Sequence, residues 1–209
     1  MESKPFKILS IDGGGIRGVF PAMFLAKFEA NLKSLGYQNW QVYHHFDLIC
    51  GTSTGGILAI ALALGIPAQQ LYELYLTKAK EIFGNKKKLF FGQFKYSSHN
   101  RTVLENLIRN KFKEANEGSD PILKDCKTNI CIPIYDLLHG TPSVLKKDHH
   151  PKFTRDYHIP AYHAALATSA APTYFDPYCA EYDDSHGCKV PFTNKVDGGV
   201  VANNPALLG

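Results

Sequence analysis

The 209-residue chain has 44% hydrophobic and 20% charged residues, which is typical of one globular domain and excludes a disordered chain. A net charge of +4 without a basic stripe argues against nucleic-acid binding, and five cysteines without a CxxC pair argue against a disulfide framework. No signal peptide precedes the first strand, and the longest apolar run, 57–66, is far below the roughly 20 residues that span a bilayer. We therefore expect a cytoplasmic protein that meets lipid only peripherally, at a membrane surface.

Apolar runs, helical spacing and glycine-rich turns predict alternating strands and helices. In chain order these are a strand (6–11), a helix (16–35), a strand (46–50), helices (57–64, 68–83 and 102–115), strands (127–137 and 143–147), a helix (159–171) and a strand (190–196). On the first helix, the spacing places five apolar side chains on one face: Phe20, Met23, Phe24, Phe28 and Leu32. The pattern predicts an α/β fold, with a mostly parallel central sheet sandwiched by helices.

We find no repeats and no linker, so residues 1–209 are interpreted as a single domain. An asparagine cap followed by proline at 203–205 predicts the start of a helix. That helix has barely begun at residue 209, so we expect the domain to be incomplete at its C-terminus.

The strongest chemical signal is Gly51-Thr52-Ser53-Thr54-Gly55, a G-x-S-x-G pattern between a predicted strand and a predicted helix. A nucleophile elbow requires this context, because a sharp turn with small flanking residues exposes the serine oxygen above the sheet. The N-terminus of the helix also favours a developing negative charge. Ser53 is therefore a candidate nucleophile, supported by Gly51 and Gly55.

A second glycine-rich turn, Asp12 to Gly18, follows the first strand. Backbone N–H groups of Gly13, Gly14 and Gly15 are candidates for an oxyanion hole, and Arg17 is a candidate for holding the loop. The same residues fit the dinucleotide pattern G-x-G-x-x-G. That alternative expects an acidic residue about 20 positions further on, at the end of the next strand, whereas this stretch is predicted to be helical.

Four sequence blocks occur in one order: DGGGIRG (12–18), GTSTG (51–55), ATSAAPTYF (167–175) and DGG (197–199) followed by NNP. Together they resemble the patatin-like phospholipase family, over residues 8 to 205. The resemblance implies a three-layer hydrolase fold and a catalytic dyad in which Asp197, followed by Gly198, is the base for Ser53. It also implies phospholipid or other acyl-lipid esters as substrates, with no cofactor and no metal.

A Ser-His-Asp triad is the alternative arrangement for a serine esterase. All nine histidines precede Asp197, so a triad in the order serine, acid, histidine needs another acid. The candidates are Asp136 or Asp156 as the acid, followed by one of three histidines, His139, His158 or His163.

Three further hypotheses concern partners and ligands. Lys86, Lys87, Lys88, Phe90 and Phe91 combine cations with aromatic rings, which suits transient contact with a membrane surface. Cys179, Cys188 and His186 are candidate ligands of a zinc site, but no second pair of ligands has the spacing of such a site. Some bacterial members of the family that the chain resembles are activated by a nucleotide signal, so regulation of this kind is one hypothesis. The remaining alternative to an enzyme is a non-enzymatic binding module. The sequence leaves the oligomeric state open.

Overall fold

The computed structural model describes residues 4–83 and 101–209. In that part of the chain the strands are β1 (Ile8–Ile11), β2 (Leu48–Gly51), β3 (Asn129–Asp136), β4 (Thr141–Lys146), β5 (Tyr178–Asp183) and β6 (Lys189–Asp197). The α-helices are α1 (Val19–Ser34), α2 (Thr54–Ala63), α3 (Ala68–Phe83), α4 (Arg101–Ala115), α5 (Ala161–Thr168) and α6 (Gly199–Ala202).

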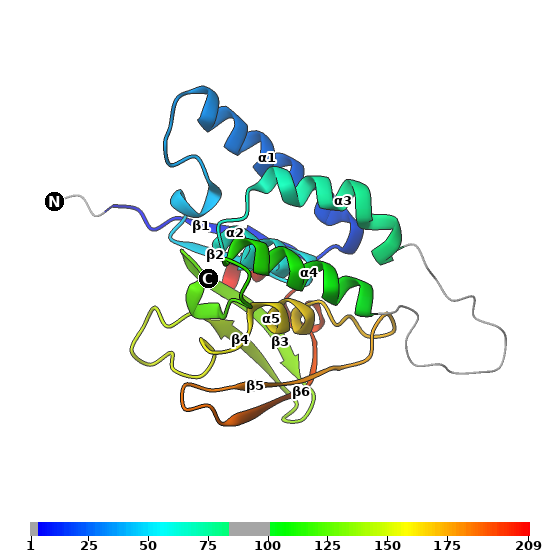
Figure 1. Cartoon of the computed structure of the whole chain (residues 1–209). Helices are drawn as coiled ribbons and strands as arrows, with labels where there is room; N and C mark the ends of the chain where they lie inside the picture. The colour runs from blue at the N-terminus through cyan, green and yellow to red at the C-terminus, as the bar shows by residue number, and fades with distance from the viewer. Residues whose placement is uncertain (1–3, 84–100) are drawn as a thin grey trace.

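One mixed sheet runs through the described residues in the order β1-β2-β3-β6-β5, with β4 also paired to β3 (Figure 1). Parallel pairing is confined to β1, β2 and β3, and β4, β5 and β6 pair antiparallel. The predicted α/β class is confirmed. Helices connect the parallel pairs, and the β3–β4 and β5–β6 pairs are hairpins, whereas β3 and β6 pair antiparallel without being consecutive strands. The sheet expected to be mostly parallel is therefore mixed, with two parallel and three antiparallel pairings in the described residues.

Strands β2 and β6 meet end to end along one edge of β3. The other edge of β3 is occupied by β4, which pairs with it from Cys131 to Asp136. On the shared edge, β2 pairs with β3 as far as Cys131, and β6 starts pairing at Ile134, opposite Asp197. Because β2 and β6 run toward each other, their last residues lie at one point of the sheet. This point is where the two predicted catalytic residues are.

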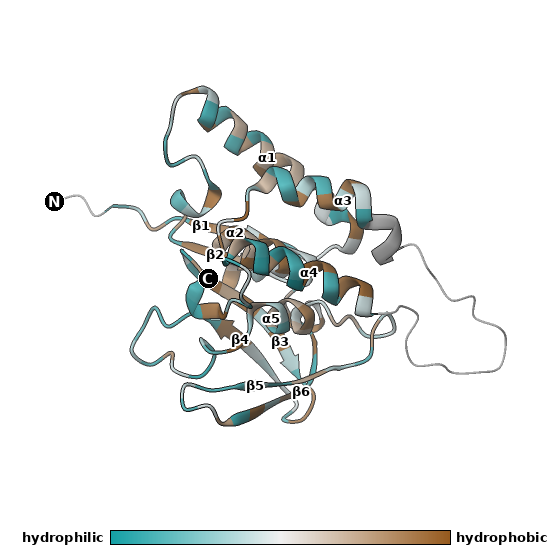
Figure 2. Cartoon of the chain, viewed as in Figure 1, coloured by the Kyte–Doolittle hydropathy of each residue, from teal (hydrophilic) through white to brown (hydrophobic). Residues whose placement is uncertain are grey.

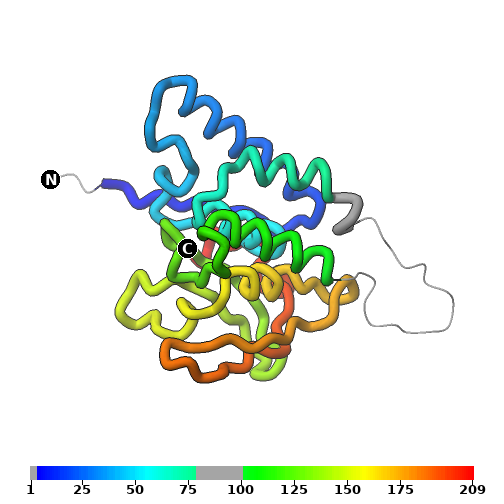
Figure 3. Tube along the Cα trace, in the orientation of Figure 1, coloured from blue at the N-terminus to red at the C-terminus, as the bar shows by residue number. Residues whose placement is uncertain are grey.

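Helices form the layers on either side of the sheet. Helices α2 and α5 pack on one face, α4 packs on α5, and α1 lies beside α3 farther out (Figures 1 and 3). The outer helices α1, α3 and α4 carry hydrophilic turns (Figure 2). The opposite face is contacted by α6 and by the 3₁₀ turn Pro205–Leu207. Asn204 caps that turn by accepting a hydrogen bond from Ala206 N at 2.9 Å, so the predicted helix start is a capped 3₁₀ turn.

The buried side of α1 differs from the apolar face that its spacing suggests. Phe20 is 67% exposed and Phe24 is 69% exposed, whereas the buried residues are Ala22, Leu25, Ala26 and Glu29. The Glu29 carboxylate accepts hydrogen bonds from the backbone N–H groups of Val42 and Ala68. The buried side of α1 therefore combines alanines and Leu25 with one carboxylate, which binds the first residue of α3.

Strand β5 is absent from the predicted elements. Its side chains alternate, with Tyr178 and Tyr182 buried and Cys179 and Glu181 exposed. This period of two is the signal that a half-buried strand leaves in a sequence.

Among the described residues, no helix is both long enough and apolar enough to cross a membrane.

Candidate active site

Ser53 sits in the sharp turn between β2 and α2, as predicted. Its backbone has φ +56° and ψ −127°, a left-handed conformation that strains a residue with a side chain. The turn is possible because Gly51 and Gly55, two residues away on either side, lack side chains. A Cβ on Gly51 would overlap the carbonyl of Gly55, and a Cβ on Gly55 would overlap the carbonyl of Ile11. The Ser53 side chain therefore stands at the N-terminus of α2, above the end of the sheet.

Replacing Gly55 with alanine is expected to destabilise the fold, because the new Cβ would meet backbone carbonyl oxygens of Ile11 and Asp12 that cannot rotate away. Overpacking of this kind costs roughly 1–3 kcal/mol or more. Urea unfolding measures the loss. Gly14→Ala is the matched control for stability, because its Cβ would make only an ordinary contact with Arg17 at 3.4 Å. Equal stability of the two variants would contradict the close approach at Gly55.

Asp197 ends β6 and is 4% exposed. Its carboxylate accepts a hydrogen bond from Gly199 N at 2.7 Å. Burial raises the pKa of Asp197 above its usual value, and the nearby Ser53 side chain and the Gly199 N–H partly oppose the rise. Gly198 has no room for a side chain, because a Cβ there would overlap the carbonyl oxygen of Pro133. The structure thus brings the half-buried Ser53 close to the buried Asp197.

The glycine loop after β1 packs directly against this pair. Gly13 N donates to Asn203 O at 3.1 Å, and a Cβ on Gly13 would lie 3.2 Å from the Cβ of Ser53. Gly14 N donates to Thr54 Oγ1 at 3.3 Å, and Gly15 has φ +56°. The loop is therefore folded onto the serine turn. The dinucleotide alternative requires a loop that is open to a pyrophosphate, and this loop is not.

A cavity of about 810 Å³ opens beside this loop. Gly13, Gly14 and Arg17 form one part of its wall, and the aromatic side chains of Phe20 and Phe24 on α1 form another. Arg17 is exposed and, within the described chain, pairs with no carboxylate and with no carbonyl through its side chain. Its predicted support of the loop stays a prediction.

The acid and histidine candidates for a triad are engaged elsewhere, except His158, whose buried Nε2 has no hydrogen-bond partner in the described residues. Asp136 holds His139 at 2.8 Å and Lys195 at 2.6 Å. Burial acts to raise the pKa of Asp136, but these hydrogen bonds outweigh it and hold the pKa well below its usual value. His163 shares a 2.5 Å hydrogen bond with the hydroxyl of Tyr178.

The last triad acid, Asp156, pairs with Arg155. Asp197 is the carboxylate whose pKa the nearby Ser53 side chain lowers. The geometry therefore favours the serine–aspartate pair over a triad.

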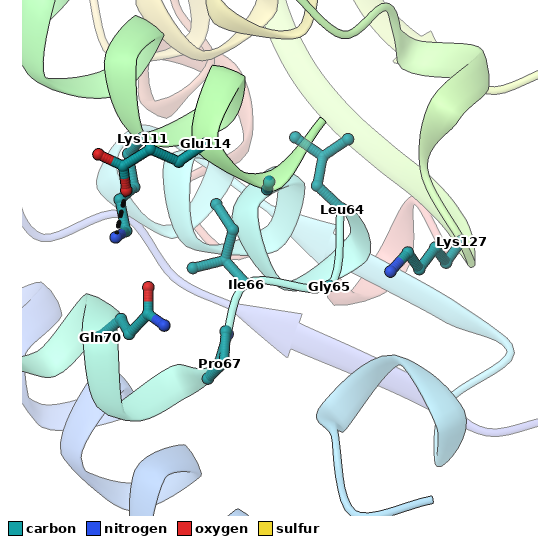
Figure 4. A pocket seen from close by; sticks show the side chains of 9 residues that line it. Leu64, Gly65, Ile66, Pro67, Gln70, Lys111, Glu114 and Lys127 are labelled. Carbon is teal, nitrogen blue, oxygen red and sulfur yellow. Dashed lines mark hydrogen bonds and ion pairs between the residues drawn. The ribbon is translucent and has the colours of Figure 1, made fainter. Parts of the chain in front are cut away.

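A second cavity, of about 310 Å³, lies at the opposite end of α2 (Figure 4). It is lined by the turn from Leu64 to Pro67 and by side chains that include Lys111 and Lys127. Lys111 is paired with Glu114 at 2.8 Å, and Lys127 packs against Gly65 beside the carbonyl end of the helix. These cations balance charges that the protein itself supplies, so we place no reaction there.

Two other sequence hypotheses have different outcomes. Cys179, Cys188 and His186 are not part of any group of three metal-binding side chains in the described residues, which leaves the zinc hypothesis without support. The Lys86, Lys87, Lys88, Phe90 and Phe91 segment lies outside the described residues.

A strained serine between a strand and a buried helix, close to a buried carboxylate, places this domain in the class of α/β proteins with a serine-hydrolase elbow. The patatin-like phospholipase family matches residues 9–208. The chain therefore belongs to the patatin-like phospholipase family.

Relatives in bacteria and plants support the same membership. The chain is 39% identical over 210 residues to a cGAMP-activated phospholipase of Escherichia coli, covering 97% of this chain and 54% of the relative. It is 34% identical over 218 residues to Patatin-like protein 2 of Arabidopsis thaliana, covering 96% of this chain and 51% of the relative. The chain thus spans about half the length of these relatives.

Among solved structures, VipD from Legionella pneumophila matches with a TM-score of 0.56 at 14% identity, over 95% of this chain and 47% of VipD. At this identity the match concerns the fold alone, and it agrees with the predicted three-layer arrangement.

Proposed function

We propose that the chain hydrolyses carboxylic esters of membrane lipids, as a phospholipase A-type acyl hydrolase. The placement of the strained Ser53 next to the buried Asp197 carries this proposal. Family membership supports the choice of acyl lipids over other esters.

In the proposed reaction, Asp197 takes the hydroxyl proton of Ser53 as the serine oxygen attacks the ester carbonyl. The alcohol leaves with that proton, and the acyl group stays on Ser53. Asp197 then takes a proton from water, which attacks the acyl-enzyme and releases the fatty acid and free Ser53. Burial makes Asp197 a stronger base than an exposed aspartate, because its raised pKa brings it closer to the working pH.

The negative charge on the carbonyl oxygen needs hydrogen-bond donors next to Ser53. The N-terminus of α2 supplies a helix dipole there. The Gly13 N–H is bound to Asn203 O at 3.1 Å and the Gly14 N–H to Thr54 Oγ1 at a longer 3.3 Å, so the proposed donors are Gly15 and also Gly14, which would exchange the Thr54 hydroxyl for the substrate oxygen. Loss of one such donor costs roughly 10²- to 10³-fold in turnover. The aromatic wall of the neighbouring cavity suits an acyl chain.

A fatty-acid release assay on mixed phospholipid vesicles tests this function in the full-length protein. We expect wild type to release fatty acid and Ser53→Ala and Asp197→Asn to lose nearly all release. A fluorophosphonate probe should label wild type and not Ser53→Ala. Equal release by all three proteins would exclude the serine–aspartate dyad. Vesicle binding with and without the 86–91 segment tests the membrane contact separately.

Regulation by a cyclic nucleotide is part of the same proposal. Relatives from Escherichia coli and Vibrio cholerae, 39% and 38% identical, are named cGAMP-activated phospholipases. The assay therefore has two arms, with and without cGAMP. Activity that is unchanged by the nucleotide would limit the proposal to the hydrolysis itself.

A further inference from the structure

The C-terminal end of α5 holds both members of the proposed dyad through their backbone amides. Ser53 N donates to Thr168 Oγ1 at 3.1 Å, and Asp197 N donates to Ala170 O at 3.1 Å. Thr168 is the last residue of α5, and Ala170 is two residues further on. One short segment therefore fixes the positions of two residues that lie 144 apart in sequence, as 197 − 53 shows.

The Thr168 hydroxyl also fills a break in the hydrogen bonding of the sheet. Along the shared edge of β3, pairing with β2 ends at Cys131 and pairing with β6 begins at Ile134. Within that break, the carbonyl of Pro133 accepts a hydrogen bond from Thr168 Oγ1 at 2.7 Å. The same carbonyl lies against Gly198, next to Asp197. The chain Ser53 N–H to Thr168 Oγ–H to Pro133 C=O thus connects the serine turn with the aspartate turn.

We propose that Thr168 is a positioning residue, whose hydroxyl holds the strained backbone of Ser53 in place next to Asp197. The inference rests on the dyad proposed above and adds a residue that touches neither the ester nor the transferred proton. Thr168 is fully buried, so its hydroxyl has no water to exchange with. A residue with φ +56° persists only where its surroundings determine it, and this hydroxyl is a direct constraint on the Ser53 amide.

Packing alone does not explain the choice of threonine. Its methyl group does pack, since a Cβ on Gly56 would lie 2.6 Å from Thr168 Cγ2. Valine would keep that methyl and nearly the same volume. It would leave the Ser53 amide and the Pro133 carbonyl without their partner. Serine would keep both hydrogen bonds and lose only the methyl. The two substitutions therefore separate positioning from packing.

The test compares Thr168→Val and Thr168→Ser with wild type in the full-length protein. For Thr168→Val we expect kcat on a soluble short-chain ester to fall by roughly 10- to 100-fold, with KM changed much less, because a displaced nucleophile reacts slowly but does not alter binding. Labelling of Ser53 by a fluorophosphonate should slow in parallel. Thr168→Ser should restore both rates to within about threefold of wild type, since the hydroxyl is back.

Thr128→Val is the matched control. Thr128 is also buried, and its hydroxyl donates to a backbone carbonyl, that of Phe46 at 2.8 Å, but it contacts neither dyad residue. We expect a comparable loss of thermal stability with unchanged labelling. All rates are measured well below the melting temperature of each variant. Thr168→Ala replaces Thr168→Val if the latter does not fold.

The pH profile gives a readout that a purely structural role would not move. The Ser53 side chain lowers the pKa of Asp197. Thr168→Val lets Ser53 drift from Asp197, so the acid limb of kcat/KM should shift to higher pH, and Thr168→Ser should reverse the shift.

Wild-type rates in Thr168→Val, failure of Thr168→Ser to rescue, or an equal loss in Thr128→Val would each overturn the inference. Inactivity of wild type itself on every ester would instead refute the proposed function. The labelling rate would still report the position of Ser53 in that case.

Discussion

Replacing Ser53 with glycine is expected to abolish ester hydrolysis and to leave a more stable chain than Ser53→Ala. Both substitutions remove the hydroxyl, and turnover should fall by about 10⁶-fold, the scale observed when a serine hydrolase loses its nucleophile. Only alanine keeps a side chain at φ +56° and ψ −127°. That conformation costs a non-glycine residue about 1–3 kcal/mol, whereas the extra freedom of glycine in the unfolded chain costs about 0.5–1 kcal/mol.

Urea unfolding of the two inactive variants measures this strain directly. We expect Ser53→Gly to exceed Ser53→Ala by about 1 kcal/mol in the free energy of unfolding, which is the difference between the two costs. The comparison is matched, because both variants have lost the Ser53 hydroxyl next to Asp197. An alanine variant as stable as the glycine variant would show that the elbow is unstrained, and would remove one support of the nucleophile assignment.

The serine turn could be predicted from sequence because it is determined locally. A buried strand, two glycines that leave room for each other and a helix start all lie between Leu48 and Ala63. Each glycine prevents a collision within this short stretch or with the adjacent strand β1. Steric constraints between residues that are close in sequence leave a pattern that a single sequence can show.

The position of Asp197 could not be predicted in this way. The sequence shows only an aspartate before two glycines at the end of an apolar run. That aspartate lies beside Ser53 because β6 runs antiparallel to β3 and ends opposite Ile134. The hydrophobic periodicity of a sequence does not show which strands pair, or whether they pair parallel or antiparallel. The family resemblance therefore carried the assignment, and the geometry now provides independent support.

Two further features depended on tertiary contacts. The aromatic residues Phe20 and Phe24 share a helix face in the sequence pattern, yet the close approach of α1 to α3 places alanines on the buried side. Thr168 lies in a block that carries the family resemblance, but nothing in the sequence shows that its hydroxyl binds the Ser53 amide. A positioning residue cannot be recognised from a sequence pattern, because its partners are distant in sequence.

Asp197→Asn is expected to reduce turnover by about 10²- to 10⁴-fold, the usual contribution of a general base. The amide is nearly the same shape and can still accept from Gly199 N, so the turn should persist. In wild type, kcat/KM should decline on the acid side at a pH above the ordinary aspartate range, because burial raises the pKa of Asp197. A pH profile with its acid limb at or below 3.8 would contradict this role.

The same substitution should raise stability at neutral pH. Because the folded-state pKa of Asp197 lies above 3.8, the folded chain binds more protons than the unfolded chain between these two values. The stability contributed by this group is fully present below 3.8 and is lost as the pH rises through the folded-state pKa. At neutral pH wild type therefore bears the cost of a buried carboxylate that Asp197→Asn avoids, and the advantage of the variant should shrink as the pH falls.

Asp136→Asn provides the opposite case in the same sheet. Burial acts to raise the pKa of Asp136, but Lys195 and His139 hold it well below 3.8, so its stabilising contribution is present above 3.8 and is lost as the pH falls through the folded-state pKa. Asp136→Asn should therefore be less stable than wild type at neutral pH. Chemical unfolding of both variants between acid and neutral pH checks the two signs together. If the stability of both variants changed in the same direction relative to wild type, Asp197 would behave like an aspartate in a structural ion pair and not like a desolvated base.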